Sequence, residues 1–149
     1  MNCPILFLNG SNDFAYPLDS YRASYRLVPA KCRHVSVVLD LPHGHIWTFD
    51  EADIFVDSVL RDGVPLPRLG RTKINGDQVS ARVVSPLPVK RVALHYTTGE
   101  GEWQKRRWQT VPAVLKRGTI TARLPGQRPV AWYFSVTDER GLRVSTEHE

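Results

Sequence analysis

The chain has 149 residues, of which 42% are hydrophobic and 23% are charged, a composition typical of folded globular proteins and not of disordered ones. This length allows one ordinary domain or two small ones, and no apolar run approaches the roughly 18 to 20 residues of a membrane-spanning helix. The formal net charge of +5 is uneven: residues 1–70 carry six Lys/Arg and eight Asp/Glu (−2), whereas residues 71–149 carry fourteen and seven (+7). This split favours a domain boundary near the middle of the chain.

Two short apolar runs near the N-terminus, Ile5–Leu8 and Val35–Leu39, have the length and composition of buried strands. Between them, residues 16–27 carry apolar side chains at spacings of three, four and three, which predicts an amphipathic helix ended by Pro29. The unit spans about the 30 residues that a right-handed β-α-β crossover needs. We therefore expect two neighbouring parallel strands joined by a helix.

A second helix is expected from Phe49 onward, with acidic residues in its first turn and Gly63 at its end. Residues 64–71 contain two prolines within Val-Pro-Leu-Pro and are predicted to be a linker. The sequence thus divides into an α/β segment (1–63), a Pro-rich linker (64–71) and a second domain (72–149).

The second domain has a different pattern, with short alternating segments separated by glycines. The segments that carry this pattern are residues 79–83, 92–96, 119–124 and 130–136. Five to seven short strands over about 78 residues are typical of a β-sandwich of the immunoglobulin or fibronectin type III kind. The predicted fold class is therefore α/β plus all-β.

Chemically competent residues follow each of the first two predicted strands. Asp13 comes after the first strand, in Asn-Gly-Ser-Asn-Asp, and His43 and His45 come after the second, in Leu-Pro-His-Gly-His. An acid and a histidine at the carboxyl ends of neighbouring parallel strands suit the orienting acid and the general base of a hydrolase triad. Asp13 is also placed to form an Asx-turn or a contact at the start of a helix, which is the commoner role of such a residue.

His43 and His45 compete for the role of base. His45, which directly follows a glycine in a loop, is the preferred candidate, and His43 is the alternative. His43 and His45 could also form a zinc site with Asp13, although we favour no metal and no cofactor. The chain contains no Gly-x-Ser-x-Gly sequence, so it lacks a recognisable nucleophile.

The second half offers two further functions. Trp103 and Trp108 could stack on sugars, but Trp and Tyr in alternating strands usually form a sandwich core. Lys105-Arg106-Arg107 could contact nucleic acid, but basic residues at an edge strand more often keep that edge soluble, so we expect no nucleic-acid partner.

Residues 4–17 together with Leu41–His45 resemble the C-terminal end of α/β-hydrolases of the dienelactone hydrolase and acetyl xylan esterase type. The resemblance covers residues 1 to about 62, and the second half is similar to the small β-domain that follows the hydrolase domain in some bacterial members. It implies that Asp13 and His45, or His43, are the second and third members of a serine triad. The first six strands and the nucleophile serine of the family are missing from this chain.

The sequence therefore predicts the C-terminal portion of a serine esterase, acting in its parent on esters such as those of an acetylated polysaccharide and inactive alone. The alternative is a non-catalytic β-sandwich module that binds carbohydrate or a partner protein. The exposed edge of a two-stranded sheet favours a homodimer or packing on the sandwich. We expect a truncated reading frame with no signal peptide as written, so the parent could be cytoplasmic or exported.

Overall fold

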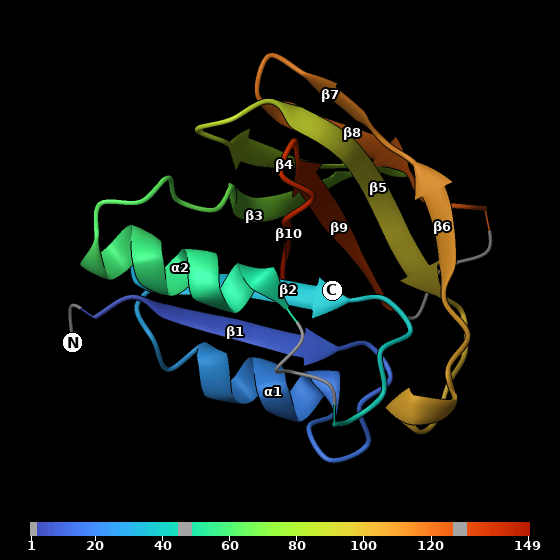
Figure 1. Ribbon diagram of the computed structural model, residues 1–149. Coiled ribbons are helices and arrows are strands. Elements are labelled where there is room, and N and C mark those ends of the chain that lie inside the picture. The colour runs from blue at the N-terminus through green and yellow to red at the C-terminus, as the bar shows by residue number, and fades with distance from the viewer. Residues whose placement is uncertain (1–2, 45–48, 127–130) are drawn as a thin grey trace.

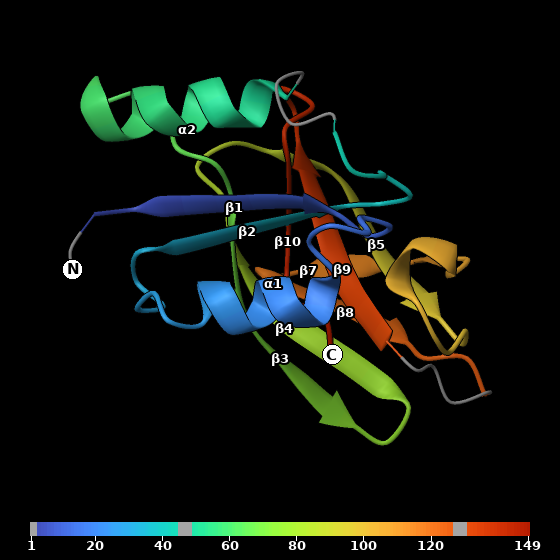
Figure 2. The same cartoon turned by 90° about the horizontal axis from the view of Figure 1, so that it is seen from below.

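A two-stranded parallel sheet begins the chain in the computed structural model, which describes residues 3–44, 49–126 and 131–149. β1 (Ile5–Gly10) pairs with β2 (Arg33–Val38), in a register that runs from Ile5 opposite Arg33 to Gly10 opposite Val38. α1 (Leu18–Tyr25) connects the two strands and α2 (Asp50–Leu60) follows them. The two helices lie on opposite faces of this small sheet (Figures 1 and 2).

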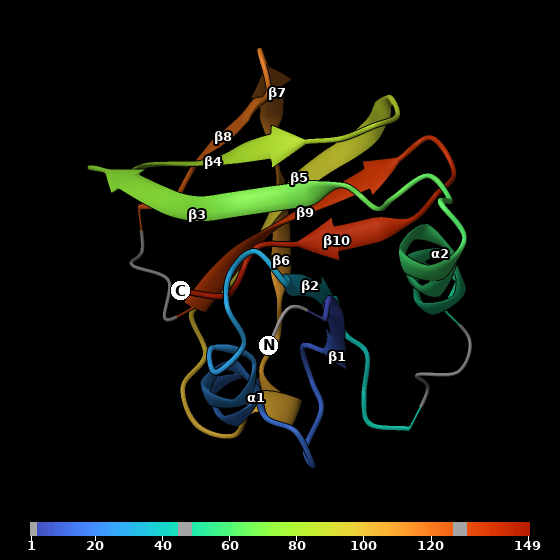
Figure 3. The same cartoon turned by 90° about the vertical axis from the view of Figure 1, so that its left-hand side faces the viewer.

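Two four-stranded antiparallel sheets form most of the remaining chain and pack face to face as a β-sandwich (Figure 3). One sheet has the strand order β10-β9-β5-β6 and the other has the order β3-β4-β8-β7. The strands are β3 (Arg68–Asn75), β4 (Gln78–Val84), β5 (Val89–Thr97), β6 (Gln109–Pro112), β7 (Val114–Lys116), β8 (Thr119–Arg123), β9 (Ala131–Asp138) and β10 (Arg143–Ser145). A short 3-10 turn, η2 (Trp103–Lys105), lies in the connection from β5 to β6.

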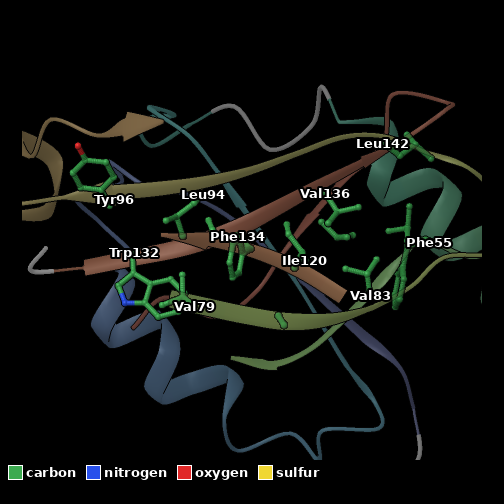
Figure 4. Close-up of a cluster of buried hydrophobic side chains, with 14 residues drawn as sticks. Phe55, Val79, Val83, Leu94, Tyr96, Ile120, Trp132, Phe134, Val136 and Leu142 are labelled. Carbon is green, nitrogen blue, oxygen red and sulfur yellow. The ribbon is translucent and has the colours of Figure 1, made fainter. Parts of the chain in front are cut away.

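Alternating side chains of the facing sheets fill the main core. Val79 and Val83 of β4 face Trp132 and Phe134 of β9 in this cluster (Figure 4). Phe55 of α2 belongs to the same cluster, and so does Leu66, which is almost fully buried within the segment predicted to be a linker. The N-terminal unit therefore shares its core with the sandwich.

β9 is buried on both faces, which explains why its first four residues, Ala131 to Phe134, are all apolar. Its residues Trp132 and Phe134 point into the sandwich core. Ala131 and Tyr133 belong to a second cluster, which also contains Leu18 of α1, Val37 of β2 and Trp108 just before β6. A strand covered on both faces carries a continuous apolar run instead of a strict alternation. The N-terminal unit supplies this second cover.

Hydrogen bonds join the N-terminal unit to β10. The Val37 backbone N–H donates to Ser145 Oγ (2.8 Å), and Ser36 Oγ donates to the Arg143 carbonyl (2.9 Å). The buried Glu51 of α2 accepts the Arg143 backbone N–H at Oε1 (2.8 Å). We call this set of contacts the β2–β10 seam.

The predicted fold class is wrong. The chain is mostly β-sheet with two short helices and three sheets in its described part, and is not a strand-helix-strand-helix fragment of an α/β-hydrolase sheet joined to a separate sandwich. The physical reason is that two strands and helices of eight and eleven residues bury too little apolar surface to form a layer of their own. They pack instead on the outer face of the sandwich. Within the described ranges, no helix combines the length and apolar character that crossing a bilayer requires.

His95 of β5 is buried between two hydroxyl groups. Its Nδ1 shares a hydrogen bond with Thr110 Oγ1 and its Nε2 shares one with Ser135 Oγ, each at 2.8 Å. Burial, with a smaller effect from the charge of Arg143, lowers the pKa of His95 to about 4. The ring is therefore neutral in the folded protein at pH 7.

We expect this histidine to make the fold sensitive to acid. The unfolded chain protonates His95 near pH 6.5 but the folded chain only near pH 4, so stability is lost as the pH falls through this window. At pH 5 this group lowers the free energy of unfolding by about 2 kcal/mol relative to pH 7.5. Urea unfolding at both pH values measures the total difference, to which His34 and His148 also contribute because burial lowers their pKa values too. His95→Gln, whose amide can bond both hydroxyls, should narrow the difference by the His95 part. An unchanged pH dependence in His95→Gln contradicts this assignment.

Candidate catalytic site

Asp13 lies in the loop that follows β1 and is almost completely buried. Its Oδ1 accepts the backbone N–H groups of Ala15 (2.8 Å) and Tyr16 (2.9 Å), which fixes the turn that leads into α1. These two bonds are the Asx-type contacts that the sequence allowed as the structural role of Asp13. The other carboxylate oxygen, Oδ2, makes neither of these bonds and is available to a different partner.

That partner is His43, in the loop that follows β2. Asp13 Oδ2 and His43 Nδ1 are 3.0 Å apart, and the His43 side chain is 37% exposed. Because Nδ1 faces the buried carboxylate, Nε2 lies on the far side of the ring and can exchange a proton with a molecule outside. The second and third members of a hydrolase triad have the same geometry, with a carboxylate that orients a histidine through Nδ1.

His45, the candidate base preferred from sequence, lies outside the described residues, so its role stays a prediction. The zinc alternative depends on it as well. Within the described ranges there is no group of three or more His, Cys, Asp or Glu side chains that could hold a metal ion.

A close approach between two loops brings Asp13 and His43 together. A Cβ atom on Gly10 would lie 1.9 Å from the carbonyl oxygen of Leu41, so only glycine fits at this position. The Asn12 N–H donates to that same Leu41 carbonyl (3.2 Å), and the Asp40 N–H donates to Ser11 Oγ (2.8 Å). The loops after β1 and β2 are thus bonded to each other just before the two side chains of the pair.

The sandwich holds the first of these loops through Asn12. Asn12 Nδ2 lies 2.8 Å from the carbonyl oxygen of Arg106, 3.3 Å from that of Gln104 and 3.5 Å from that of Trp103. Asn12 Oδ1 accepts a hydrogen bond from Ser11 Oγ (2.7 Å). Sequence reasoning did not single out Asn12 because its partners lie 91–94 residues away and form no local pattern.

The environment of the pair is aromatic. The ring centroids of Phe14 and Tyr16 lie 5.4 and 5.5 Å from that of His43, and both side chains are more than half exposed. Burial, followed by the negative charge of Asp13, raises the pKa of Tyr21 to about 12. Tyr21 therefore stays protonated at neutral pH and donates to the Leu8 carbonyl (3.3 Å).

The tryptophans considered as a sugar platform are packed against other side chains. The guanidinium of Arg106 lies 3.6 Å from the centroid of Trp103, and Trp108 is buried with its ring nearly parallel to Trp103 at 6.4 Å. Trp132 is in the sandwich core. Arg106 thus covers the partly exposed ring of Trp103, and Trp108 and Trp132 are buried, so these rings are used mainly in packing.

Comparisons with known proteins find similarity at the level of structure and not of sequence. No family model matches this chain, and no curated protein matches it. The crystal structure of XAC1771, a carbohydrate acetylesterase from Xanthomonas citri, is similar with a TM-score of 0.58 and 13% sequence identity. The match covers 98% of this chain and 40% of that protein, so the chain spans two fifths of the neighbour's length. At this identity the likeness shows a shared fold.

We expect Gly10→Ala to disturb the pair. The added methyl must displace the Leu41 loop, which lowers the free energy of unfolding by about 1–3 kcal/mol and shifts the NMR signals of the His43 ring. Gly70→Ala is a matched control because its Cβ would meet nothing nearer than 3.5 Å. Equal effects of the two substitutions would contradict the importance of the close approach.

Asn12→Asp should loosen the Asp13 loop. The substitution places a carboxylate oxygen against three carbonyl oxygens, which costs about 1–3 kcal/mol of stability. Hydrogen exchange of the Ala15 and Tyr16 amides reports the loosening directly. Asn75→Asp, at an exposed position at the end of β3, is the control. Unchanged exchange at both amides would show that Asn12 does not position Asp13.

Proposed function

We propose that this chain is part of a carbohydrate esterase in which Asp13 is the orienting acid and His43 is the general base. The observation that carries the proposal is the 3.0 Å contact between a buried carboxylate and the Nδ1 of a partly exposed imidazole. The fold shared with a carbohydrate acetylesterase supports an esterase-like function. The finer assignment to the dienelactone hydrolase and acetyl xylan esterase type belongs to the same proposal.

In this mechanism the chain's own residues orient and move a proton. Asp13 accepts the Nδ1–H of His43, which leaves Nε2 unprotonated and ready to take the proton of an attacking serine hydroxyl. The imidazolium formed is stabilised by the Asp13 carboxylate. Nε2 then gives the proton to the departing sugar oxygen when the ester bond breaks.

The serine and the oxyanion donors are proposed to come from outside these 149 residues, because the sequence contains no Gly-x-Ser-x-Gly. Without them an Asp–His pair supplies little rate enhancement. The 149-residue chain is therefore expected not to turn over esters by itself.

The proposed substrate class is an acetylated polysaccharide. Phe14 and Tyr16, 64% and 53% exposed, present aromatic rings beside His43 against which the apolar face of a sugar can pack. A second candidate function is a non-catalytic module that binds carbohydrate, and a cleft lined by basic residues such as Arg68, Arg71 and Arg82 favours it.

The experiment measures acetate release from acetylated xylan by this chain and by the longest protein encoded in its reading frame. In the longer protein, His43→Ala and Asp13→Asn should each lower kcat by roughly 10³- to 10⁴-fold. His45→Ala should leave kcat within about tenfold of the unsubstituted protein, since it removes a side chain outside the pair. Lys116→Ala, at an exposed position of β7 and outside the pair, is the control.

Each outcome has a definite meaning. Loss of activity in His45→Ala but not in His43→Ala would assign the base to His45. Full activity in both variants, or no acetate release by the longer protein, would contradict the esterase proposal. Rapid hydrolysis by the 149-residue chain would show that the nucleophile lies within it.

A further inference from the structure

A basic cleft lies at the opposite end of β2 from His43. Its walls come from the loop between α1 and β2 with the start of β2, the first half of β3, part of β4, and the end of β10 with the residues after it. Its volume is about 920 Å³. The cleft is lined by six basic side chains and by the two carboxylates of Glu147 and Glu149. The basic residues are Arg26, Lys31, Arg33, Arg68, Arg71 and Arg82.

Three of these six basic side chains interact with groups of the protein itself: two are in ion pairs and one is bonded to backbone carbonyls. Arg26 and Arg33 both pair with Glu147, at 2.7 and 2.6 Å. Arg68 donates to the backbone carbonyls of Ala30 and Lys31, each at 3.1 Å, and so retains its charge. Its guanidinium is therefore fixed in place on the wall of the cleft.

The remaining three cations are not paired with any carboxylate of the described residues. Within the ranges that the structure describes, Lys31, Arg71 and Arg82 make no ion pair, and all three are exposed. β3 has a register shift between Leu69 and Thr72, so that Gly70 and Arg71 stand outside its ladder with β4. Bulges of this kind often re-aim a side chain beside a functional site. The cleft thus has a surplus of positive charge that its own acids do not balance.

We propose that this cleft binds an anionic polysaccharide through the carboxylates of its uronic acid residues. The planar guanidinium fork matches a carboxylate in a two-point contact, which a row of arginines can repeat along a polymer. No Phe, Tyr or Trp is among the described residues that line the cleft, whereas single-stranded nucleic acid binds by stacking its bases on such rings. A concave surface also cannot enter the grooves of duplex DNA.

This site goes beyond the proposed esterase function and does not depend on it. The four residue steps along β2 from His34, on the cleft wall, to Val38 already cover about 13 Å. The cleft can therefore hold one part of a polymer while another part lies near His43. Binding needs no serine, so it is measurable on the 149-residue chain.

The test is calorimetric titration of the chain with polygalacturonate in 50 mM salt, with neutral galactan and single-stranded oligothymidylate as comparison ligands. Arg71→Ala/Arg82→Ala removes two exposed cations of the cleft and should weaken polygalacturonate binding by about tenfold or more. Arg91→Ala/Arg107→Ala removes the same charge from exposed positions outside the cleft and should change binding less than about twofold. Circular dichroism verifies that both double variants fold.

Three results together support the proposal: polygalacturonate binds and its affinity falls with salt, galactan does not bind, and only the Arg71→Ala/Arg82→Ala variant loses the binding. Absence of binding overturns it. Equal losses in the two double variants also overturn it, because they indicate attraction to overall charge. Tighter binding of oligothymidylate with the same dependence on Arg71 and Arg82 overturns it in favour of a nucleic-acid partner.

Discussion

The β2–β10 seam is the constraint on which the rest of the structure depends. A parallel pair of strands with two short helices is too small to be stable in water without a further surface to cover. The sandwich has the complementary problem, because the outer face of β9 presents Ala131 and Tyr133 and would otherwise be exposed. The Val37–Ser145 and Ser36–Arg143 hydrogen bonds set the position of one unit on the other, so that each buries the apolar face of its neighbour. Without the seam, each unit would expose the apolar face that the other now buries.

The geometry of the Asp13–His43 pair follows from this joint construction. Parallel pairing of β1 with β2 brings the loops that carry Asp13 and His43 to one edge, and the absence of a side chain at Gly10 lets the loops touch. Burial of the Asp13 carboxylate is compensated by two backbone N–H groups and the His43 ring, as a buried charge requires. Asn12 then ties this loop to the β5–β6 connection. The site is therefore held by contacts from both parts of the chain, which is the support that a precisely oriented acid–base pair needs.

The sequence reveals the individual helices and strands better than it reveals how they pack on one another. Short apolar runs and a helical period predict β1, β2 and α1 to within a few residues, because these depend on neighbouring side chains. The fold class was wrong because periodicity describes each element and not what covers it. The first four residues of β9 are all apolar because a second unit lies on the outer face of this strand. Spacing placed Asp13 near a histidine, and the glycine before His45 favoured His45 over His43. Of these two histidines only His43 lies in the described part of the chain, where it contacts Asp13. The division at residues 64–71 stays a prediction.

Charge gives a further example of information that appears only in three dimensions. The sequence places most of its excess positive charge after residue 70, yet the basic cleft takes Arg26, Lys31, Arg33 and Arg68 from before that point. The cleft exists because the seam brings the start of β2 beside β3 and β10. The electrostatic attraction of its exposed cations is screened by salt, whereas the interaction between the buried Asp13 carboxylate and His43 is screened little. The proposed binding of a polymer in the cleft is therefore expected to weaken with salt, whereas the proposed proton transfer at His43 is expected to change little, so that the two proposals can be tested separately on one molecule.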